Sequence, residues 1–539
     1  MNNETRNPWW RRGVFYQVYI RSFADGNGDG TGDIAGLRSR LPYLESLNID
    51  AIWINPWFPS PLNDGGYDVA DYCDINPAYG TLEEAEALIA EAAERGMKVM
   101  VDLVPNHTSS EHRCFREALA SPPGSAARDR YVFKDGRGPG GDEPPTNWKS
   151  VFGGSTWTRV PDGQWYLHLF DPTQPDLNWS NPVVQDDFHD ILRFWLDRGA
   201  AGFRVDVAHG LAKDPTFPDV VDESNTEAHR TERLDHPHWD RDEVHAIIRG
   251  WRTVLDEYEG SVMVAEAWVA NWDRLARYLR PDEFHQVFDF EFLEASWDAD
   301  ELRTAIDNSL AGSERVGSVP TWVLSNHDVV RHATRYALPV GVESKPWLLD
   351  GDRSVLDPDA GLRRARASTL LALALPGSVY LYQGEEMGLP EVHDLPEDVL
   401  DDPVWRQSSN TEKGRDGCRV PIPWSSDGES YGFGARGSWL PQPEGWGGFA
   451  ADLQDGVEGS TLELYRAALT IRSEMLTEDE AITWLPSDPG VLMFQRGTGV
   501  RCIVNISGEP IPLPGSDVLI ASDDVSEGLL APDAAAWIA

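Results

Sequence analysis

The chain is poor in cysteine, in basic residues and in long apolar segments. Its four cysteines are scattered over 539 residues without paired or metal-ligand spacing, which argues against a disulfide framework and favours a cytoplasmic protein with reduced thiols. Lysine and arginine number 46 against 89 aspartate and glutamate residues, a net charge of -43, so nucleic acid and anionic membranes are not expected as partners. No stretch approaches the roughly 20 apolar residues of a membrane span, and the N-terminus lacks an apolar segment of signal-peptide length.

The composition provides the material for a large core. Apolar residues make up 41% of the chain and 22 residues are tryptophan, so a packed interior and flat ligand-stacking surfaces are expected. Length alone suggests three or four domains at roughly 150 residues each, although one α/β barrel can take up 250 residues or more. We expect a monomer or a homodimer.

Eight short apolar runs, rich in β-branched and aromatic residues, alternate with segments of helical periodicity. Two clear helical segments are 34–48 and 81–96, and the second opens with Thr81 as an N-cap residue. Eight such repeats predict an α/β fold, a parallel sheet closed into a (β/α)8 TIM barrel, with a doubly wound open sheet as the alternative. The predicted strands are 14–20, 51–55, 98–104, 202–207, 262–268, 286–292, 322–328 and 378–384.

Two intervals between predicted strands are too long for one helix, and long irregular insertions are usually functional. We therefore divide the chain into 1–105 as the first part of the barrel, 106–180 as an inserted domain after the third strand, and 181–477 as the second part of the barrel. Residues 385–458, rich in glycine, proline and tryptophan, form an irregular subdomain within that second part. Short strands split by turns predict a C-terminal antiparallel β-sandwich at 478–539.

Polar residues cluster where the predicted strands end. His107 follows the third strand, Asp206 lies on the fourth, Glu266 on the fifth, and His327 with Asp328 on the seventh. In a barrel, the C-terminal ends of the strands form the active-site face. One carboxylate at a strand end is usually a helix cap or an ion-pair partner, but the recurrence of polar side chains at these ends predicts an active site.

Arg204 and Asp206 are two residues apart on one strand, so both side chains point to the same side of it. A guanidinium beside a carboxylate lowers its pKa, which predicts an ionised Asp206. Glu266 stands between two alanines and before Trp268, and this apolar setting, together with the charge of Asp328, is expected to raise its pKa. One ionised and one protonated carboxyl group suit the cleavage of a glycosidic bond.

Seven stretches occur in the order typical of one enzyme family. They are DLVPNH (102–107), GFRVDVAHG (202–210), EAW (266–268) and SNHD (325–328), with GYDV (66–69), QPDLNW (174–179) and QGEEMG (383–388). Over about 13–425 the chain resembles the α-amylase superfamily of glycoside hydrolases, in its α-glucosidase and oligo-1,6-glucosidase branch. The resemblance implies a (β/α)8 barrel with an excursion after the third strand and a C-terminal β-sandwich.

The resemblance also implies residue roles and a reaction. Asp206 would be the nucleophile, Glu266 the acid/base, and Asp328 the residue that stabilises the transition state through the sugar hydroxyls. The implied reaction is retaining cleavage of short malto- or isomalto-oligosaccharides by double displacement, with the two carboxyl groups about 5–5.5 Å apart and no organic cofactor. The other residues that the resemblance assigns to binding of the sugar are His107, Arg204 and His327.

The resemblance further implies that the site is closed beyond one sugar, so that cleavage occurs from a chain end. Tyr67 would stack on the sugar ring and Asp68 would form an ion pair at the pocket floor. Its partner arginine falls in 414–424, where Arg419 is the better match and Arg415 the alternative.

Other functions remain open within this resemblance. An α-transglucosylase or a sucrose-using enzyme would run the same first step with a sugar acceptor, and an internally cleaving amylase is disfavoured by a closed pocket. A catalytically silent, transporter-associated relative would lack the three carboxylates that are present here. Val207 directly after the predicted nucleophile is typical of members that accept α-1,6 bonds, but the continuation Ala208-His209 departs from both known patterns and leaves the linkage open.

The loop 25–36, DGNGDGTGDIAG, places acidic and amide side chains on alternate positions. It is no EF-hand, because Gly36 stands where a bidentate glutamate belongs, and it lacks the lysine of a phosphate loop. The oxygen atoms favour a structural Ca²⁺, or Mg²⁺, as relatives in the resembling branch hold there; the alternative is a solvated turn in which Asp33 caps the next helix. The predicted ligands are Asp25, Asn27, Asp29, Thr31 and Asp33.

Overall fold

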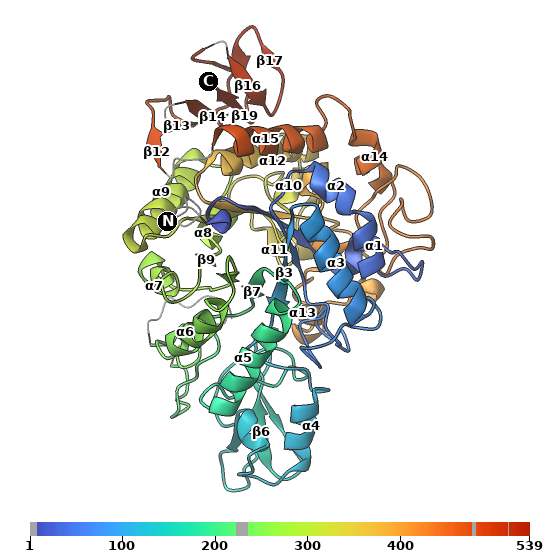
Figure 1. The fold of residues 1–539 in the computed structure, drawn as a ribbon, viewed down its shortest axis with the longest axis vertical. Coiled ribbons are helices and arrows are strands. Elements are labelled where there is room, and N and C mark those ends of the chain that lie inside the picture. The colour runs from blue at the N-terminus through green and yellow to red at the C-terminus, as the bar shows by residue number, and fades with distance from the viewer. Residues whose placement is uncertain (1–7, 222–234, 477–480, 498, 516) are drawn as a thin grey trace.

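A computed structural model describes residues 8–221, 235–476, 481–497, 499–515 and 517–539. Its centre is an eight-stranded parallel sheet with the order β10-β11-β1-β2-β3-β7-β8-β9 (Figure 1). Neighbouring strands follow the chain order, and the last two strands return beside β1, so the sheet forms a nearly closed barrel and not the doubly wound alternative. The strands are β1 (Val14–Val18), β2 (Ala51–Ile54), β3 (Lys98–Leu103), β7 (Gly202–Val205), β8 (Val262–Ala265), β9 (Gln286–Val287), β10 (Thr321–Val323) and β11 (Ser378–Tyr382).

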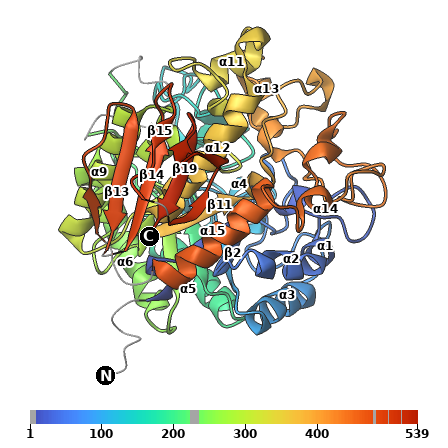
Figure 2. The same ribbon diagram turned by 90° about the horizontal axis from the view of Figure 1, so that it is seen from above.

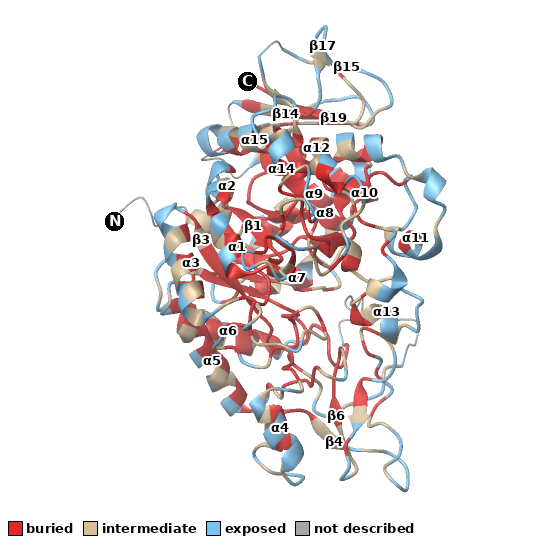
Figure 3. Cartoon of the chain, turned by 90° about the vertical axis from the view of Figure 1, so that its right-hand side faces the viewer, coloured by how far each residue is buried: buried red, intermediate tan, exposed pale blue. Residues whose placement is uncertain are grey.

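Helices cover the outside of this barrel, and their buried faces pack against the strands (Figure 3). The N-cap of α3 forms the full capping box, in which Thr81 accepts from the backbone N–H of Glu84 and the Glu84 side chain accepts from the backbone N–H of Thr81. The principal covering helices are α1 (Ile34–Ser39), α2 (Leu41–Ser46), α3 (Leu82–Glu94), α5 (Pro182–Leu196), α6 (Val244–Leu255), α7 (Trp272–Tyr278), α9 (Ala299–Val316), α12 (Pro358–Ala374) and α15 (Thr461–Met475).

All eight strands end earlier than predicted, so Asp206 and Glu266 each lie one residue beyond their strand, and the sixth and seventh strands differ most. The sixth strand ends at Val287, because Asp289 accepts a hydrogen bond from the backbone N–H of Phe292 and starts helix α8 (Phe290–Glu294). The seventh ends at Val323, so His327 and Asp328 lie in the loop after β10 and not on the strand itself.

The chain segment that connects β3 to β7 contains a small three-stranded antiparallel sheet, in the order β4-β6-β5. This sheet lies at one end of the molecule (Figure 1). Its core contains Trp148, Trp157 and Phe170, and these pack with Val207 and Trp239 from the segment after β7. The inserted segment thus reaches the C-terminal end of the strand that carries Arg204. Its elements are α4 (Arg113–Ala120), β4 (Phe133–Asp135), β5 (Trp157–Arg159) and β6 (Gln164–Leu167).

Two antiparallel sheets at the C-terminal end pack face to face, as predicted for a sandwich, and the larger lies over α12 and α15 (Figure 2). Trp537 is fully buried and donates its indole N–H to the carbonyl of Leu370 on α12 at 3.0 Å. The larger sheet contains β12 (Ile482–Trp484), β13 (Val491–Arg496), β14 (Val500–Asn505), β16 (Val518–Ala521) and β19 (Ala534–Ile538), and the smaller contains β15 (Ile511–Pro512), β17 (Val525–Ser526) and β18 (Leu529–Leu530).

The segment 385–458 between β11 and α15 is largely irregular and folds back toward the start of the chain. The backbone N–H of Asp25 donates to the carbonyl of Phe433, and that of Trp439 donates to the carbonyl of Gly30. The remaining α-helices here and after β10 are α10 (His332–Arg335), α11 (Ser344–Asp350), α13 (Pro403–Gln407) and α14 (Ala451–Gln454). Within the described ranges, no helix is long and apolar enough to cross a membrane.

Candidate active site

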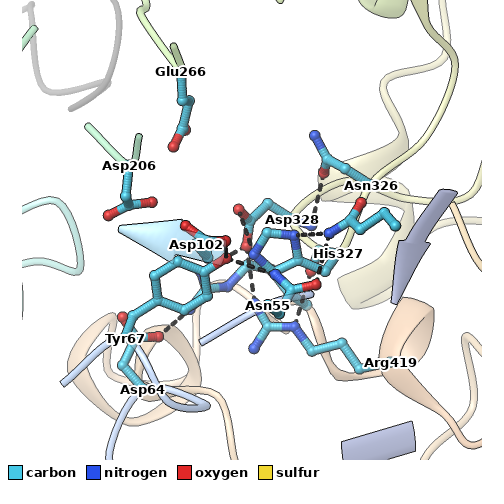
Figure 4. Close-up of polar contacts among 12 residues, drawn as sticks. Asn55, Asp64, Tyr67, Asp102, Asp206, Glu266, Asn326, His327, Asp328 and Arg419 are labelled. Carbon is cyan, nitrogen blue, oxygen red and sulfur yellow. Dashed lines mark hydrogen bonds and ion pairs between the residues drawn. The ribbon is translucent and has the colours of Figure 1, made fainter. Parts of the chain in front are cut away.

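One buried guanidinium links two of the predicted catalytic carboxylates. Arg204 lies on β7, and its Nη1 donates to Asp206 Oδ1 at 2.6 Å, while its Nη2 donates to Glu266 Oε2 at the end of β8. Its Nη1 also donates to Asp102 Oδ1 on β3 at 3.0 Å. Three adjacent strands thereby deliver their carboxylates to one cation, and Figure 4 shows Asp206 and Glu266 on the same side of the site.

The third carboxylate, Asp328, is held by two arginines and a histidine. Arg415 Nη1 and Arg419 Nη2 each donate to Asp328 Oδ1 at 2.9 Å, and His327 Nε2 lies 3.2 Å from its Oδ2 (Figure 4). The backbone N–H of Asp328 donates to Asn326 Oδ1, which fixes the turn after β10. Asp328 thus faces the same site from the loop after β10, and its charge acts on Glu266.

Tyr67 forms one wall of the site. Its ring stacks on that of His327, with centroids 5.2 Å apart and planes 8° apart. Its hydroxyl donates to Asp102 Oδ2 at 2.9 Å and accepts from Asn55 Nδ2 at 2.6 Å. Gln17 holds the imidazole of this stack, because its amide nitrogen lies 2.7 Å from His327 Nδ1. Tyr67 is therefore rigidly placed for ring stacking.

His107 joins the barrel to the inserted segment. Its Nε2 lies 3.1 Å from the carbonyl oxygen of Tyr67 and 3.1 Å from Gln174 Nε2, and the side chain is buried. Gln174 also donates to Asp64 Oδ2 at 3.0 Å. The histidine and the pocket-wall tyrosine are thus tied to the same loop.

The ion pair predicted between Asp68 and Arg419 is wrong. Asp68 accepts instead from Ser60 Oγ at 2.7 Å and from the backbone N–H of Asn63 at 3.0 Å. An ion pair forms instead between Asp64 and Arg415, at 2.7 Å, so neither Arg419 nor the alternative Arg415 is the partner of Asp68. Arg419 still reaches the site, because it forms an ion pair with Asp328. Burial raises the pKa of Asp68 to about 6.

The pKa order of the two linked carboxyl groups is the reverse of that predicted. Burial raises the pKa of Asp206 well above its ordinary value, Arg204 opposes this, and the like charge of Glu266 adds to it. Burial also acts to raise the pKa of Glu266, but Arg204 and the hydrogen bonds from Asp206 and Trp268 together outweigh burial, so the pKa lies below its ordinary value. The prediction failed because Arg204 contacts both groups and not Asp206 alone.

The charge of Asp328 has a clearer cause. Burial acts to raise its pKa, but His327 and the two arginines outweigh burial and hold the pKa far below its ordinary range. Burial lowers the pKa of His327 well below its ordinary value, so the imidazole is neutral at pH 7. The site therefore combines one permanent anion with a coupled pair of carboxyl groups.

In the predicted metal loop, aspartate side chains accept hydrogen bonds from backbone N–H groups of the loop itself. Both oxygens of Asp25 accept backbone N–H bonds, from Gly28 at 2.6 Å and Gly30 at 2.9 Å. Asp33 accepts from Gly36 and caps α1, which is the alternative role considered for it. Nowhere in the described part of the chain do three or more His, Cys, Asp or Glu side chains gather as a metal site, so the calcium site stays a prediction.

Sequence reasoning gave no role to several buried polar residues of the site. Asp102 and Gln17 interrupt apolar strands, and a polar group in such a position needs a hydrogen-bond partner, which is the signal that could have found them. No comparable signal marks the loop and subdomain residues, because their orientation depends on irregular backbone. The residues missed are Gln17, Asn55, Asp64, Asp102, Gln174 and Asp402.

The family model of the α-amylase catalytic domain matches residues 17–479, most of the chain and every residue of this site. The chain belongs to the α-amylase family. This glycoside hydrolase family membership agrees with the barrel, the inserted segment and the C-terminal sheets described above.

Curated relatives within the family span nearly the whole chain. A probable α-glucosidase of Rhizobium meliloti (strain 1021) is 38% identical, over 94% of this chain and 91% of that protein. An oligo-1,6-glucosidase of Parageobacillus thermoglucosidasius is 31% identical, over 96% and 95%.

Solved structures of the family share the fold of this chain over nearly its whole length. The α-glucosyl transfer enzyme XgtA superposes with a TM-score of 0.83 at 34% identity, covering 99% of this chain and 100% of that one. The trehalulose synthase MutB from Pseudomonas mesoacidophila MX-45 gives a TM-score of 0.86 at 29% identity, covering 99% of each chain.

Proposed function

We propose that the chain is a retaining, exo-acting α-glucosidase that releases α-glucose from the non-reducing ends of short malto- or isomalto-oligosaccharides. The observation that carries this proposal is the Arg204 guanidinium, which holds the carboxylates of Asp206 and Glu266 in one buried site facing Asp328. Double displacement at an anomeric carbon requires one carboxyl group as nucleophile and a second as acid/base, and both can act from one face of a barrel mouth. The α-glucosidase and oligo-1,6-glucosidase relatives support the same substrate class.

The proposed reaction has two steps. Asp206 attacks the anomeric carbon while Glu266 gives its proton to the leaving oxygen, so that the glycosidic bond breaks and a glucosyl ester of Asp206 forms. Glu266, now a carboxylate, takes a proton from water, whose oxygen attacks the same carbon and frees Asp206. Two inversions give α-glucose. Asp328, anionic and held by Arg415 and Arg419, would accept hydrogen bonds from the sugar hydroxyls.

The first step requires an ionised Asp206 and a protonated Glu266, the reverse of the order in the free site. We infer that the shared proton passes to Glu266 when a sugar fills the site and brings its leaving oxygen to that carboxyl group. Arg204 contacts both carboxylates through different nitrogens, so it stays the counter-ion of whichever group is charged.

Exo-action would follow from the Arg415 cluster. Arg415 forms ion pairs with Asp64, Asp328 and Asp402, which come from three separate loops. We propose that this cluster closes the pocket behind one glucosyl unit, with Tyr67 stacked on its ring.

An α-transglucosylase, or a member that uses sucrose, is the second candidate. The fold similarity to an α-glucosyl transfer enzyme and a trehalulose synthase favours it. The first step would be the same, and a sugar hydroxyl would replace water in the second.

Proton NMR of reactions with maltose, isomaltose, sucrose and starch tests these proposals together. The proposal predicts an initial excess of α-glucose over the anomeric mixture that the reducing-end unit of maltose or isomaltose contributes, and only slow release from starch. An initial excess of β-glucose over that mixture contradicts retention, and rapid internal cutting of starch contradicts the closed pocket. New oligosaccharides, formed while the reducing-end glucose is released but the transferred glucosyl unit does not reach water, favour the transglucosylase.

We also propose that the loop 25–33 holds a structural Ca²⁺ or Mg²⁺. The loop would offer oxygens of Asp25, Asn27, Asp29 and Asp33 and a carbonyl of Thr31, and each side-chain oxygen that accepts one N–H bond keeps a second lone pair. Bound metal would neutralise the loop's negative charge and tie it to the 430–439 segment. Millimolar Ca²⁺ should then raise Tm and EDTA lower it, with both effects lost in Asp29→Ala; a Tm that ignores the ion contradicts the site.

A further inference from the structure

Trp268 lies two residues after Glu266 and hydrogen-bonds to its carboxylate. The indole Nε1 donates to Glu266 Oε1 at 3.0 Å. An indole N–H donates and cannot accept, so this contact stabilises the ionised carboxylate more than the protonated acid. The side chain therefore touches the group that has to give and take a proton.

The indole is fixed from behind by an aromatic stack. Its ring lies on that of Phe290, with centroids 3.8 Å apart and planes 9° apart. Phe290 is the first residue of α8, and the N-cap Asp289 anchors that helix through the backbone N–H of Phe292. The early end of the sixth barrel strand thus places a rigid platform under Trp268.

Hydrogen bonds hold both carboxyl oxygens of Glu266. A carboxylate offers about four lone-pair positions. Oε2 accepts from Arg204 Nη2 and, at 3.4 Å, from the backbone N–H of Val207. Oε1 accepts from Trp268.

We infer that Trp268 is a positioning residue for the acid/base: its N–H holds Oε1 of Glu266 and favours the ionised form of that carboxyl group. This inference rests on the glycosidase function proposed above. As the proton leaves for the glycosidic oxygen and that C–O bond breaks, charge builds on Glu266 and the bond from the indole strengthens.

The charged groups around Glu266 also shift its pKa. Arg204 and Asp206 face it from β7, and Asp328 faces it from the loop after β10. Arg204 lowers the pKa of Glu266 and Asp328 raises it, and the Trp268 N–H acts in the same direction as Arg204. Because the Asp206 and Glu266 titrations are coupled, the limbs of a pH profile belong to the pair and not to one residue.

Trp268→Phe tests the inference, since it removes the N–H but keeps an aromatic ring against Phe290. The measurement is the pH profile of kcat/KM for 4-nitrophenyl α-glucoside, whose limbs report the free enzyme. The sum of the two apparent pKa values should rise by about one unit, because an N–H bonded to a carboxylate favours its ionised form roughly tenfold or more. A loss of packing alone would lower activity at every pH without moving the limbs.

Two further variants make the outcome decisive. Trp272→Phe removes the indole at the start of α7, which has no hydrogen bond to Glu266, and should leave the profile in place. Phe290→Leu keeps the Trp268 indole but removes the ring that it stacks on, and should shift the profile in the same direction by less, which also covers a Trp268→Phe chain that fails to fold.

The inference is overturned by an unmoved profile in Trp268→Phe, or by an equal shift in Trp272→Phe. If Trp268→Phe does not fold, an unmoved profile in Phe290→Leu overturns it. A natural chain that releases no glucose from any α-glucoside overturns the proposed function and this inference together, whereas an active natural chain with unmoved variants overturns only the inference.

Discussion

At the scale of single residues, two neighbouring aspartates differ in their contact with Arg415: Asp64 forms an ion pair with it and Asp68 does not. Asp64→Asn removes the charge that faces Arg415 Nη2 at 2.7 Å and should lower kcat/KM roughly ten- to a hundredfold, since a hydrogen bond between charged groups contributes about 1.5–3 kcal/mol. Asp68→Asn, which touches no arginine, should change kcat/KM by less than about threefold. Steady-state kinetics with maltose distinguish them. The opposite ranking would restore Asp68 to the pocket floor.

The same aspartates show what sequence can and cannot predict for a residue. Asp206, Glu266 and Asp328 could be predicted because regular strands bring their ends to one face. Asp64 and Asp68 lie in one irregular loop, where Gly65 and Gly66 adopt positive φ angles of 57° and 110°. Which of the two aspartates then points into the site depends on that backbone, and no periodicity in the sequence carries this information.

At the scale of elements, the strand that carries Arg204 depends on one glycine. Gly202 begins β7 with φ of +152°, and a Cβ there would lie 1.9 Å from the carbonyl oxygen of Val262 on β8. Gly202→Ala should therefore force β7 and β8 apart and cost on the order of 3 kcal/mol or more. Thermal unfolding should show a Tm lowered by several degrees.

Gly448→Ala is the matched control, because an added methyl group there meets no atom within 4 Å. Its Tm should stay within about one degree of the natural chain. Equal stability of the Gly202 and Gly448 variants would contradict the close pairing of β7 with β8.

The elements also show where an apolar run misleads. The buried stretch 286–292 has the composition of a strand, but only Gln286–Val287 pair with β8. A core-facing strand and a core-facing helix are both apolar, so the run cannot mark the change between them. The change is marked by Asp289, whose side chain caps α8, and this capping was the local signal that the strand prediction overlooked.

At the scale of the whole molecule, buried glutamates after β11 make stability depend on pH. Burial raises the pKa of Glu385 to about 8 and that of Glu391 to about 7. Their folded pKa values exceed the unfolded value, so the folded state binds more protons and stability falls as pH rises through about 4.5 to 8. These two groups therefore lower the stability of the folded state up to about pH 8 and not further above it.

Glu385→Gln removes the larger of these effects and keeps the shape of the side chain. Between pH 6 and 9 the Tm of this variant should fall less than that of the natural chain, with a stability difference on the order of 2 kcal/mol at pH 9. Glu117→Gln, on the exposed side of α4, is the control and should follow the natural chain. Parallel Tm curves for all three would contradict the buried, protonated Glu385.

The whole-molecule fold was the most predictable level, because eight repeats of strand and helix have few ways to close. The packing of the C-terminal sheets on α12 and α15 was not predictable. It depends on side chains such as Trp537, whose partner carbonyl lies 167 residues away in sequence. Non-local contacts of this kind leave no local pattern.

Trapping of the glucosyl-enzyme tests the central claim most directly. The chain is treated with 5-fluoro-α-glucosyl fluoride, digested, and analysed by mass spectrometry. The account predicts one fluoroglucosyl adduct, on the peptide that contains Asp206, and none in Asp206→Asn. An adduct on another carboxylate, or undiminished turnover of maltose by Asp206→Asn, would contradict it.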